Sequence, residues 1–232
     1  MAVVFENNSS AVTTGSVTSA NISYTPQAIN SMLVVFVGMF GSGVRQFSVS
    51  DNIEGSTGWK EVKQYNPDQY VGIFYKENIP NGITTITVQQ TGATAAWVMV
   101  CAEFSGMGNN VGLDATDSNT DPSSSSTHFG SAFGISSPTV SDLVVVAAGQ
   151  LEATATECSP GSGYNEVPTG FANNNKLFQY KIISGPAILE KGGWTNTGTA
   201  RVANSIIGIL SQGSTQTGLP FISSIGAKRA FR

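Results

Sequence analysis

The sequence is poor in charged residues, which make up 11% of its 232 positions, against roughly 25% in an average soluble protein. Glycine, serine, threonine and asparagine take their place. A surface of short uncharged polar side chains suits strands and turns. It also suits a protein packed in an assembly, where like charges side by side would repel each other. A low-charge secreted protein would have the same composition, so that alternative stays open.

Basic residues are scarce and unevenly placed. The net charge of -4 argues against nucleic-acid binding, because a nucleic-acid-binding protein needs a basic surface. Residues 1–190 contain 6 Lys and Arg against 15 Asp and Glu, whereas residues 191–232 contain five basic residues and no acid. We therefore expect an acidic body with a basic C-terminal end.

Cysteine and histidine are nearly absent, with two and one respectively, which excludes the usual zinc ligand sets. Cys101 lies in an apolar run and Cys158 in a loop rich in Gly, Pro and Ser; the sequence leaves open whether they form a disulfide. The start lacks the features of a signal peptide, and no stretch reaches the roughly 18 apolar residues of a membrane span. We therefore expect a soluble protein made in a cytoplasm, with no membrane partner.

Helical periodicity is also absent, whereas strand patterns are frequent. Short apolar or alternating runs bounded by turn residues predict strands over 16–24, 32–37, 46–50, 70–75 and 142–150. The clearest stretch, 78–106, predicts one hairpin: a Thr-rich strand, a turn at Thr91-Gly92 and a long apolar strand.

Several of these segments occur twice. A weaker copy of the hairpin pattern closes the chain over 180–211. Ile73–Glu77 resembles Leu177–Ile183, and three such matches are separated by 110, 105 and 106 residues. A nearly constant offset indicates a duplicated motif.

The duplication predicts an all-β fold, namely a jelly-roll-like antiparallel β-sandwich built from two similar halves, 16–106 and 141–211. Neither half looks apolar enough for its own core, so we expect one domain over 1–213 with about eight to ten main strands and one shared core. Residues 105–140 show no apolar periodicity and predict a crossover loop. Residues 214–232 are expected to form a basic arm.

Candidate metal and catalytic residues gather in this crossover. His128 has neither a nucleophile elbow nor an ordered element beside it, so we interpret it as a solvated loop histidine. Asp114, Asp117 and Asp121 are oxygen ligands suited to calcium, but they lack EF-hand spacing and are also ordinary turn residues. We predict no cofactor and no metal site, with calcium as the open alternative.

Carboxylates near strand ends are the remaining catalytic candidates. Glu61, Glu77 and Glu103 would have to converge in pairs to hydrolyse a glycoside, and a hydrogen-bonded structural role for Glu103 is the simpler interpretation. We therefore predict that the protein is not an enzyme. Trp59 and Trp194 follow Gly-rich turns and are predicted as exposed platforms for glycan stacking, whereas Trp97 is predicted in the core.

A set of short motifs occurs in a characteristic order: Leu33–Val35, Val49–Asp51, Phe74–Gly82, Thr84–Val88, Glu103–Gly106, Gly112–Asp114 and Asp142–Val145. Over roughly residues 16–210 the chain resembles a group of β-sandwich proteins found in bacteriophage genomes and on bacterial surfaces. The resemblance implies a structural or adhesive module and supplies no catalytic residues.

These observations predict a bacteriophage virion structural protein, foremost a capsid decoration (cement) protein assembled in the host cytoplasm. The alternatives are a tail or fibre component and a carbohydrate-binding adhesion module. The arm would bind the major capsid or tail protein of the same particle through Lys228, Arg229, Phe231 and Arg232. By analogy with threefold particle sites, we expect a homotrimer.

Overall fold

The computed structural model describes residues 2–13, 17–39, 46–67, 70–92, 96–107, 109–121, 125–128, 130–131, 134–139, 142–151, 158–169, 176–200 and 203–212. These residues form strands and turns, in agreement with the predicted all-β class. None of them belongs to a helix long and apolar enough to cross a membrane.

The first half of the molecule is a β-sandwich of two sheets. Its inner sheet has the strand order β1-β8-β3-β6-β5 and its outer sheet the order β2-β7-β4. The strands are β1 (Val4–Val12), β2 (Ser19–Ser23), β3 (Met32–Met39), β4 (Gln46–Asp51), β5 (Lys60–Tyr65), β6 (Tyr70–Lys76), β7 (Thr85–Thr91) and β8 (Trp97–Ser105).

The second half repeats this arrangement. Its inner sheet has the order β14-β15-β12-β18-β9, and its outer sheets are β10-β17-β13 and the small pair β11-β16. The strands are β9 (Val111–Asp121), β10 (Ser125–His128), β11 (Ile135–Ser137), β12 (Asp142–Leu151), β13 (Cys158–Pro160), β14 (Asn165–Glu166), β15 (Lys176–Ser184), β16 (Ala187–Glu190), β17 (Trp194–Ala200) and β18 (Ala203–Gln212).

The two halves share one jelly-roll topology. The inner order β1-β8-β3-β6-β5 corresponds to β9-β18-β12-β15-β14, and the outer order β2-β7-β4 corresponds to β10-β17-β13. In both halves, strands from the start of the half pair with strands from its end, as in a jelly roll made of two Greek keys. The predicted duplication is therefore confirmed, and the pair β11-β16 is an addition to the second half.

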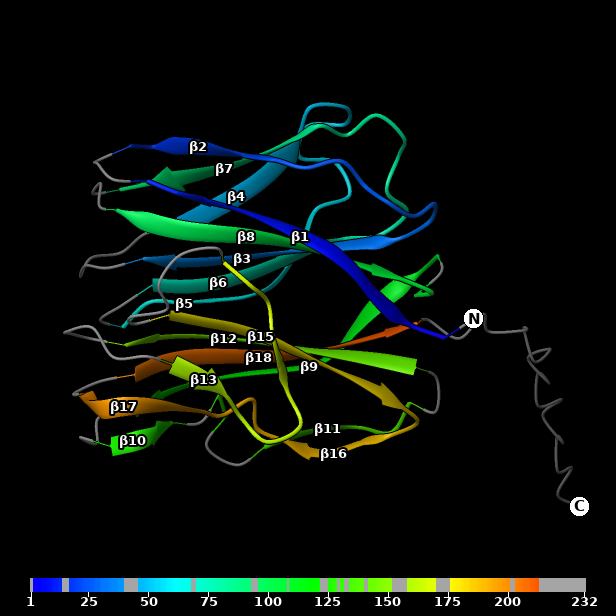
Figure 1. The fold of residues 1–232 in the computed structure, drawn as a ribbon. Coiled ribbons are helices and arrows are strands. Elements are labelled where there is room, and N and C mark those ends of the chain that lie inside the picture. The colour runs from blue at the N-terminus through cyan, green and yellow to red at the C-terminus, as the bar shows by residue number, and fades with distance from the viewer. Residues whose placement is uncertain are drawn as a thin grey trace, which may run out of the picture.

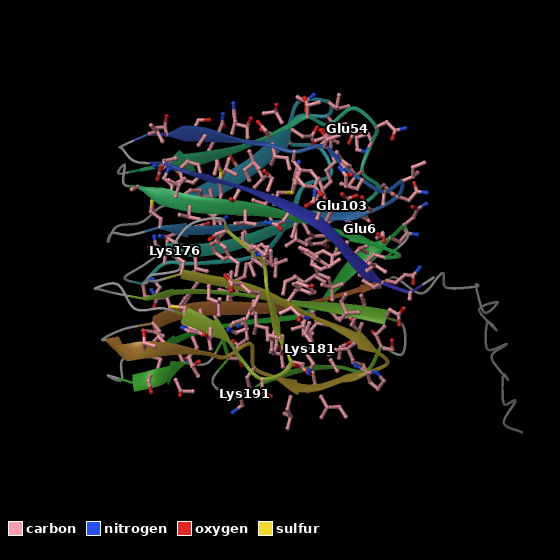
Figure 2. All side chains as sticks on the ribbon, in the orientation of Figure 1. Glu6, Glu54, Glu103, Lys176, Lys181 and Lys191 are labelled. Carbon is pink, nitrogen blue, oxygen red and sulfur yellow. The ribbon has the colours of Figure 1, made fainter. Side chains whose placement is uncertain are left out.

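The sheets stack as four layers (Figure 1), and side chains fill the spaces between them (Figure 2). The largest apolar cluster lies between the two inner sheets; it contains Phe36 and Phe178, whose rings stack with centroids 5.5 Å apart. The first half also has a core of its own, which includes Trp97, and the second half has two smaller ones. The prediction that neither half has a core of its own was therefore wrong, because each inner sheet is apolar on both faces.

The two inner sheets face each other with their strand orders reversed, so that the edge at β1 lies over β15 and the edge at β5 lies over β9. Phe5 on β1 stacks on Tyr180 of β15, with ring centroids 4.8 Å apart. At the other edge, the Tyr65 hydroxyl of β5 lies 2.9 Å from the Thr120 hydroxyl of β9. Since β1 corresponds to β9 and β5 to β14, this alignment relates the two halves by an approximate two-fold rotation.

Two predicted connections were wrong. Residues 78–106 do not form a hairpin, because β7 belongs to the outer sheet and β8 to the inner sheet; the turn at Gly92, where φ is +102°, carries the chain across the sandwich. Residues 105–140 are not a crossover loop, because they contain β9, β10 and β11. β9 is an edge strand with many polar side chains, so no apolar alternation marked it.

Candidate functional site

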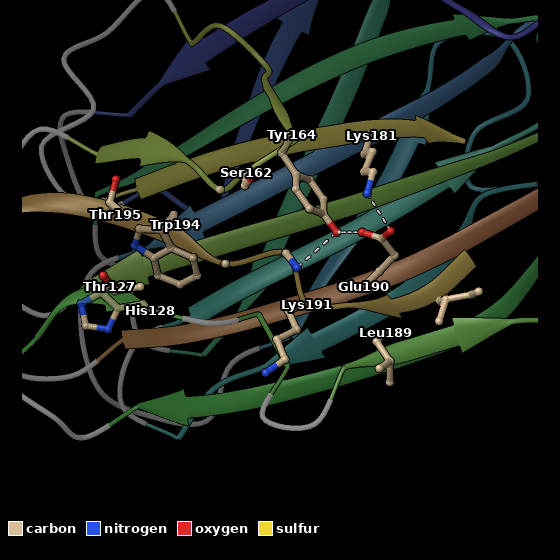
Figure 3. Close-up of a pocket in the computed structure, with 14 residues that line it drawn as sticks. Thr127, His128, Ser162, Tyr164, Lys181, Leu189, Glu190, Lys191, Trp194 and Thr195 are labelled. Carbon is tan, nitrogen blue, oxygen red and sulfur yellow. Dashed lines mark hydrogen bonds and ion pairs between the residues drawn. The ribbon is translucent and has the colours of Figure 1, made fainter. Parts of the chain in front are cut away.

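A lysine, a glutamate and a tyrosine meet on the outer side of the second half (Figure 3). Tyr164 immediately precedes β14, Lys181 lies on β15, and Glu190 ends β16. The Lys181 ammonium donates to Oε1 of Glu190 at 2.7 Å, and the Tyr164 hydroxyl donates to Oε2 at 2.9 Å. The Lys181 ammonium also lies 5.7 Å from the centre of the Tyr164 ring. We call these three residues the second-half cluster.

The electrostatics of this cluster keep the tyrosine protonated. Burial raises the pKa of Tyr164 well above its usual value, and the neighbouring Glu190 charge and its hydrogen bond raise it further. The backbone amide of Gly192 donates to the Tyr164 hydroxyl at 3.2 Å. The Tyr164 hydroxyl therefore stays protonated at neutral pH and both donates and accepts a hydrogen bond within the cluster.

Glycines and one glutamine set the backbone around the cluster. The side-chain amide of Gln179 donates to the carbonyls of Gly192 and Gly193, at 2.8 and 3.0 Å, and its Oε1 accepts from the Gly161 amide at 3.1 Å. A Cβ on Gly161 would lie 2.2 Å from the Gly193 carbonyl oxygen. The two backbone segments thus approach more closely than any side chain would allow.

A pocket of about 440 Å³ opens beside the cluster. His128 and Trp194 lie next to each other at one end of it, with ring centroids 5.6 Å apart (Figure 3). Their side chains are buried, at 0% and 1% exposure. Within the described part of the chain, neither Nε2 of His128 nor Nε1 of Trp194 has a hydrogen-bond partner. Both atoms are buried within the packed side chains and are not open to the pocket, so their missing hydrogen bonds are a local cost to stability.

The rim of the pocket is apolar and exposed. Ile188 and Leu189 also line the pocket and are 73% and 63% exposed. Leu189 has a φ of +53°, a left-handed conformation that is unfavourable for a residue of this size. Its amide is held by the Ser136 hydroxyl at 3.0 Å. Strained, solvent-facing apolar residues beside a pocket are typical of functional surfaces.

The first half contains a matching cluster that is closed. The Lys76 ammonium, at the end of β6, lies 2.6 Å from Oδ2 of Asp51 and 2.7 Å from Oε2 of Glu54. Trp59, immediately before β5, donates to Oδ2 of Asp51 at 3.0 Å, and Lys76 lies 6.0 Å from its ring centre. Lys76 and Asp51 are buried, with 1% and 0% of their side chains exposed. We call these four residues the first-half cluster.

The two tryptophans predicted as stacking platforms, Trp59 and Trp194, differ in their exposure. Trp59 is half-buried on a small pocket of about 190 Å³, and its indole nitrogen is bound to Asp51. The prediction that Trp194 is exposed was wrong: its ring is buried against β12, where a Cβ on Gly149 would lie 2.4 Å from the ring. Trp194 therefore contributes to the wall of the larger pocket and offers no open face for stacking.

The residues predicted in the crossover have structural partners. The interpretation of His128 as a solvated histidine was wrong, because its ring is buried and Nδ1 lies 3.2 Å from Oδ2 of Asp121. Asp114 accepts hydrogen bonds from the hydroxyls of Ser137, Thr139 and Ser211, and Asp117 accepts from Ser131. Among the described residues, no three His, Cys, Asp or Glu side chains are grouped so as to hold a metal ion.

The three glutamates considered for catalysis lie apart in separate hydrogen-bond networks. Glu103 is buried and accepts from the Tyr24 hydroxyl at 2.6 Å and from the amides of Gln27 and Ala28 at 2.8 and 3.0 Å. Glu77 binds Lys60 and the Val111 amide, and Glu61 accepts from Gln64. Glu103 therefore anchors the segment before β3 to the inner sheet.

The other predicted residues divide into two groups. Cys101 and Cys158 are both buried and form no disulfide with each other, and burial raises the pKa of the Cys158 thiol to about 12. Lys228, Arg229, Phe231 and Arg232 lie outside the described residues, so the role of the arm stays a prediction.

Sequence reasoning missed all three members of the second-half cluster, although a signal for Lys181 was present. When the matched segments Ile73–Glu77 and Leu177–Ile183 are aligned, Lys181 corresponds to Lys76. Repeated lysines on apolar strands indicate paired carboxylates, because a buried ammonium needs a counter-charge.

Comparisons with known proteins add no further evidence. The chain matches no family model, no curated protein and no solved structure.

Proposed function

We propose that the protein is a structural component of a bacteriophage particle, foremost a decoration protein that bridges subunits on the capsid surface. The fold is compatible with this role, since jelly rolls build viral capsid proteins as well as lectin domains. The observation that carries the proposal is the chemistry of the first outer sheet.

The outward face of β2-β7-β4 presents only short uncharged polar side chains. Its inward residues, such as Ile22, Val49 and Val88, are buried in the core. The alternating outward residues are Ser19, Asn21, Ser23, Gln46, Ser48, Ser50, Thr85, Thr87, Gln89 and Thr91. We call them the polar face. Burying such a face against a neighbour requires no ion to lose its hydration, and each hydroxyl or amide can both donate and accept.

The internal duplication supports a bridging role. The two outer layers lie at opposite ends of the four-layer stack (Figure 1), and the central core joins the halves. Exposed residues of β17, Thr195 and Thr197, give the second outer layer polar, uncharged side chains as well. One molecule can therefore contact two neighbours at once, and two weak contacts on one body add through avidity.

The test compares two identical substitutions at exposed asparagines. Asn21→Lys lies on the polar face, whereas Asn165→Lys lies on β14, away from it. Each variant is mixed with particles of the encoding phage that lack the protein, and bound protein is measured after sedimentation. We expect Asn21→Lys to reduce occupancy and Asn165→Lys to leave it unchanged. Equal occupancy of both variants would exclude the polar face, and no sedimentation of the wild type would exclude the particle role.

A separate truncation tests the arm. Deleting residues 214–232 removes Lys228, Arg229, Phe231 and Arg232. If the arm binds an acidic neighbour, the truncated protein should lose occupancy, and the binding of the full-length chain should weaken as salt rises. Normal occupancy of the truncated protein would show that the folded body binds alone.

A further inference from the structure

We propose that Lys76 and Asp51 of the first-half cluster condense to an amide bond, with Glu54 as the base that carries the protons. The bond would link the two sheets of the first half covalently, because Lys76 ends β6 of the inner sheet and Asp51 ends β4 of the outer sheet. This inference goes beyond the particle role, since the reaction needs only the folded chain.

The amine and the carboxyl group are held together where water is excluded. Nζ of Lys76 lies 2.6 Å from Oδ2 of Asp51, and 1% and 0% of the two side chains are exposed. Because the carboxyl carbon is one bond beyond Oδ2, Nζ lies near the separation of roughly 3–3.5 Å at which two reacting atoms are poised. Such fixed proximity raises the rate of bond formation by many orders of magnitude.

The backbone turn after Asp51 makes its carboxyl carbon easier to attack. Oδ1 accepts hydrogen bonds from the amides of Ile53 and Glu54, at 2.9 and 2.8 Å. A carboxylate is a poor electrophile, but two amides aimed at one oxygen stabilise the negative charge that this oxygen carries in the tetrahedral intermediate. Nε1 of Trp59 donates to the other oxygen, Oδ2, at 3.0 Å and assists its departure.

Glu54 is placed to move the protons. Its Oε2 lies 2.7 Å from Nζ of Lys76, on a turn that is closed by the backbone bridge between Asp51 and Gly55. Glu54 takes one proton from the ammonium, the lone pair of the amine forms the bond to the carboxyl carbon, and Glu54 passes the proton to Oδ2.

A second proton then follows the same route from the nitrogen to Oδ2. The bond between the carboxyl carbon and Oδ2 breaks, and Oδ2 leaves as water. Two protons of the ammonium enter the water and the third stays on the amide nitrogen. Glu54 ends as the carboxylate it was at the start, so the reaction needs no oxidant, reductant or other co-reactant.

The product replaces a buried charge pair by a neutral group. An ammonium and a carboxylate that are buried together lose their hydration, and this cost disappears when they become an amide. The side chain of Glu54 is 45% exposed, so the cluster has a route to solvent by which the water can leave. Asp51 titrates as a carboxylate before the reaction and no longer titrates after it, so its acid sensitivity belongs to the unreacted protein.

The second-half cluster lacks these features. Within the described part of the chain, Lys181 forms an ion pair with one carboxylate, Glu190, and 31% of the lysine side chain is exposed. The oxygens of Glu190 accept from Lys181 and from the Tyr164 hydroxyl, in place of two backbone amides. Lys181→Arg is therefore the matched control for Lys76→Arg.

The experiment is the intact mass of the purified full-length protein, measured under denaturing conditions after prolonged storage at neutral pH. We expect the wild type to be lighter than its sequence by one water molecule. Digestion with chymotrypsin should then give one peptide in which residues 48–59 are joined to residues 76–97.

Substitutions assign the missing water to the cluster. Lys76→Arg keeps the positive charge but has no amine to form the amide, so it should have its full mass. Glu54→Gln keeps the pair of Lys76 and Asp51 but removes the base, so it should lose water roughly 100-fold more slowly. Glu61→Gln, at an exposed glutamate, and Lys181→Arg should both behave as the wild type.

Thermal unfolding shows whether each variant is folded, and Glu54 lies on a surface turn where the substitution by Gln is tolerated even if Lys76→Arg does not fold. A succinimide at Asp51-Asn52 would lose the same mass, but it would persist in Lys76→Arg and leave the two peptides unjoined. Full mass in the wild type, a mass loss that persists in folded Lys76→Arg, unjoined peptides, or an unchanged rate in Glu54→Gln would overturn the proposal.

Discussion

Lys76 and Lys181 lie on corresponding strands of the two halves, each beside an aromatic residue that precedes the inner-sheet edge strand, yet one is enclosed and the other lines a pocket. In the first half, Asp51 at the end of β4 provides the counter-charge. In the second half, the corresponding strand, β13, ends at Pro160, and the carboxylate comes from Glu190 on the added strand β16.

The comparison shows that a short added pair of strands, β11-β16, can change the surroundings of a lysine that both halves share. The described residues of the first half contain no equivalent of the pair β11-β16, and the corresponding segment between β6 and β7 buries Ile79 and Ile83. In the second half, the same position holds exposed Ile188 and Leu189. The jelly roll is kept in both halves, whereas in the second half the buried acid comes from a different strand and a pocket lies beside it.

The largest effect is expected from Lys76→Met. It would leave Asp51 as a buried carboxylate with its main counter-charge gone, which costs about 3–5 kcal/mol of unfolding free energy. Urea unfolding of the purified protein measures this loss. A loss below about 1 kcal/mol would show that the first-half cluster is not closed.

The next effect concerns the contact between the halves. A Cβ on Gly208 of β18 would lie 2.3 Å from Cγ1 of Val62 on β5, so Gly208→Ala should destabilise the protein by about 1–3 kcal/mol. Gly112→Ala is the matched control, because the nearest atom to its Cβ is at 3.8 Å. Equal unfolding midpoints for the two variants in urea would contradict the close packing of β5 on β18.

Acid should weaken the first-half cluster. Burial opposes the ionisation of Asp51, but hydrogen bonds from the amides of Ile53 and Glu54, from Lys76 and from Trp59 outweigh it, so the pKa of Asp51 lies below its usual value. A lowered folded-state pKa stabilises the protein above the unfolded pKa of about 3.9, and this stability is lost as pH falls through the folded pKa.

Unfolding free energies measured from about pH 6 down to about pH 2, a range that includes the unfolded pKa of about 3.9, test this expectation. Asp51→Asn should flatten the acid limb of the curve. A limb of unchanged steepness would assign the acid sensitivity elsewhere, for example to Asp114, whose pKa is also lowered, since three hydroxyl hydrogen bonds outweigh its burial.

The smallest effect on stability is expected from Lys181→Met. Lys181 is 31% exposed, but Glu190 is only 10% exposed, so the loss should lie at or just above the upper end of the range of about 0–1 kcal/mol for exposed pairs. Because the Tyr164 hydroxyl still donates to Glu190, the unfolding free energy should fall less than in Lys76→Met. A loss as large as that of Lys76→Met would mean that the two clusters have the same structural role.

The sequence predicted the central strands of the inner sheets well because they are apolar on both faces. Residues 32–37 lie within β3, whose side chains are all buried. On β8, the apolar side chains alternate between two cores: Met99 and Cys101 face the first-half core, and Val100 and Ala102 face the central core.

Edge strands and the pocket were not predictable in the same way. β1 and β9 each pair with a single neighbour and carry many polar side chains, so neither shows apolar alternation. The pocket depends on the approach of the segments around Gly161 and Gly193 and on the burial of His128 and Trp194, which come from distant parts of the sequence. Such long-range contacts leave no local pattern.

A crystal structure of the full-length protein tests the division between the halves most directly. We predict that Lys76 is enclosed by Asp51 and Glu54 in the first half, and that an open pocket lies beside Lys181 and Glu190 in the second half. An open first-half cluster, or a second-half pocket filled by side chains, would contradict the account.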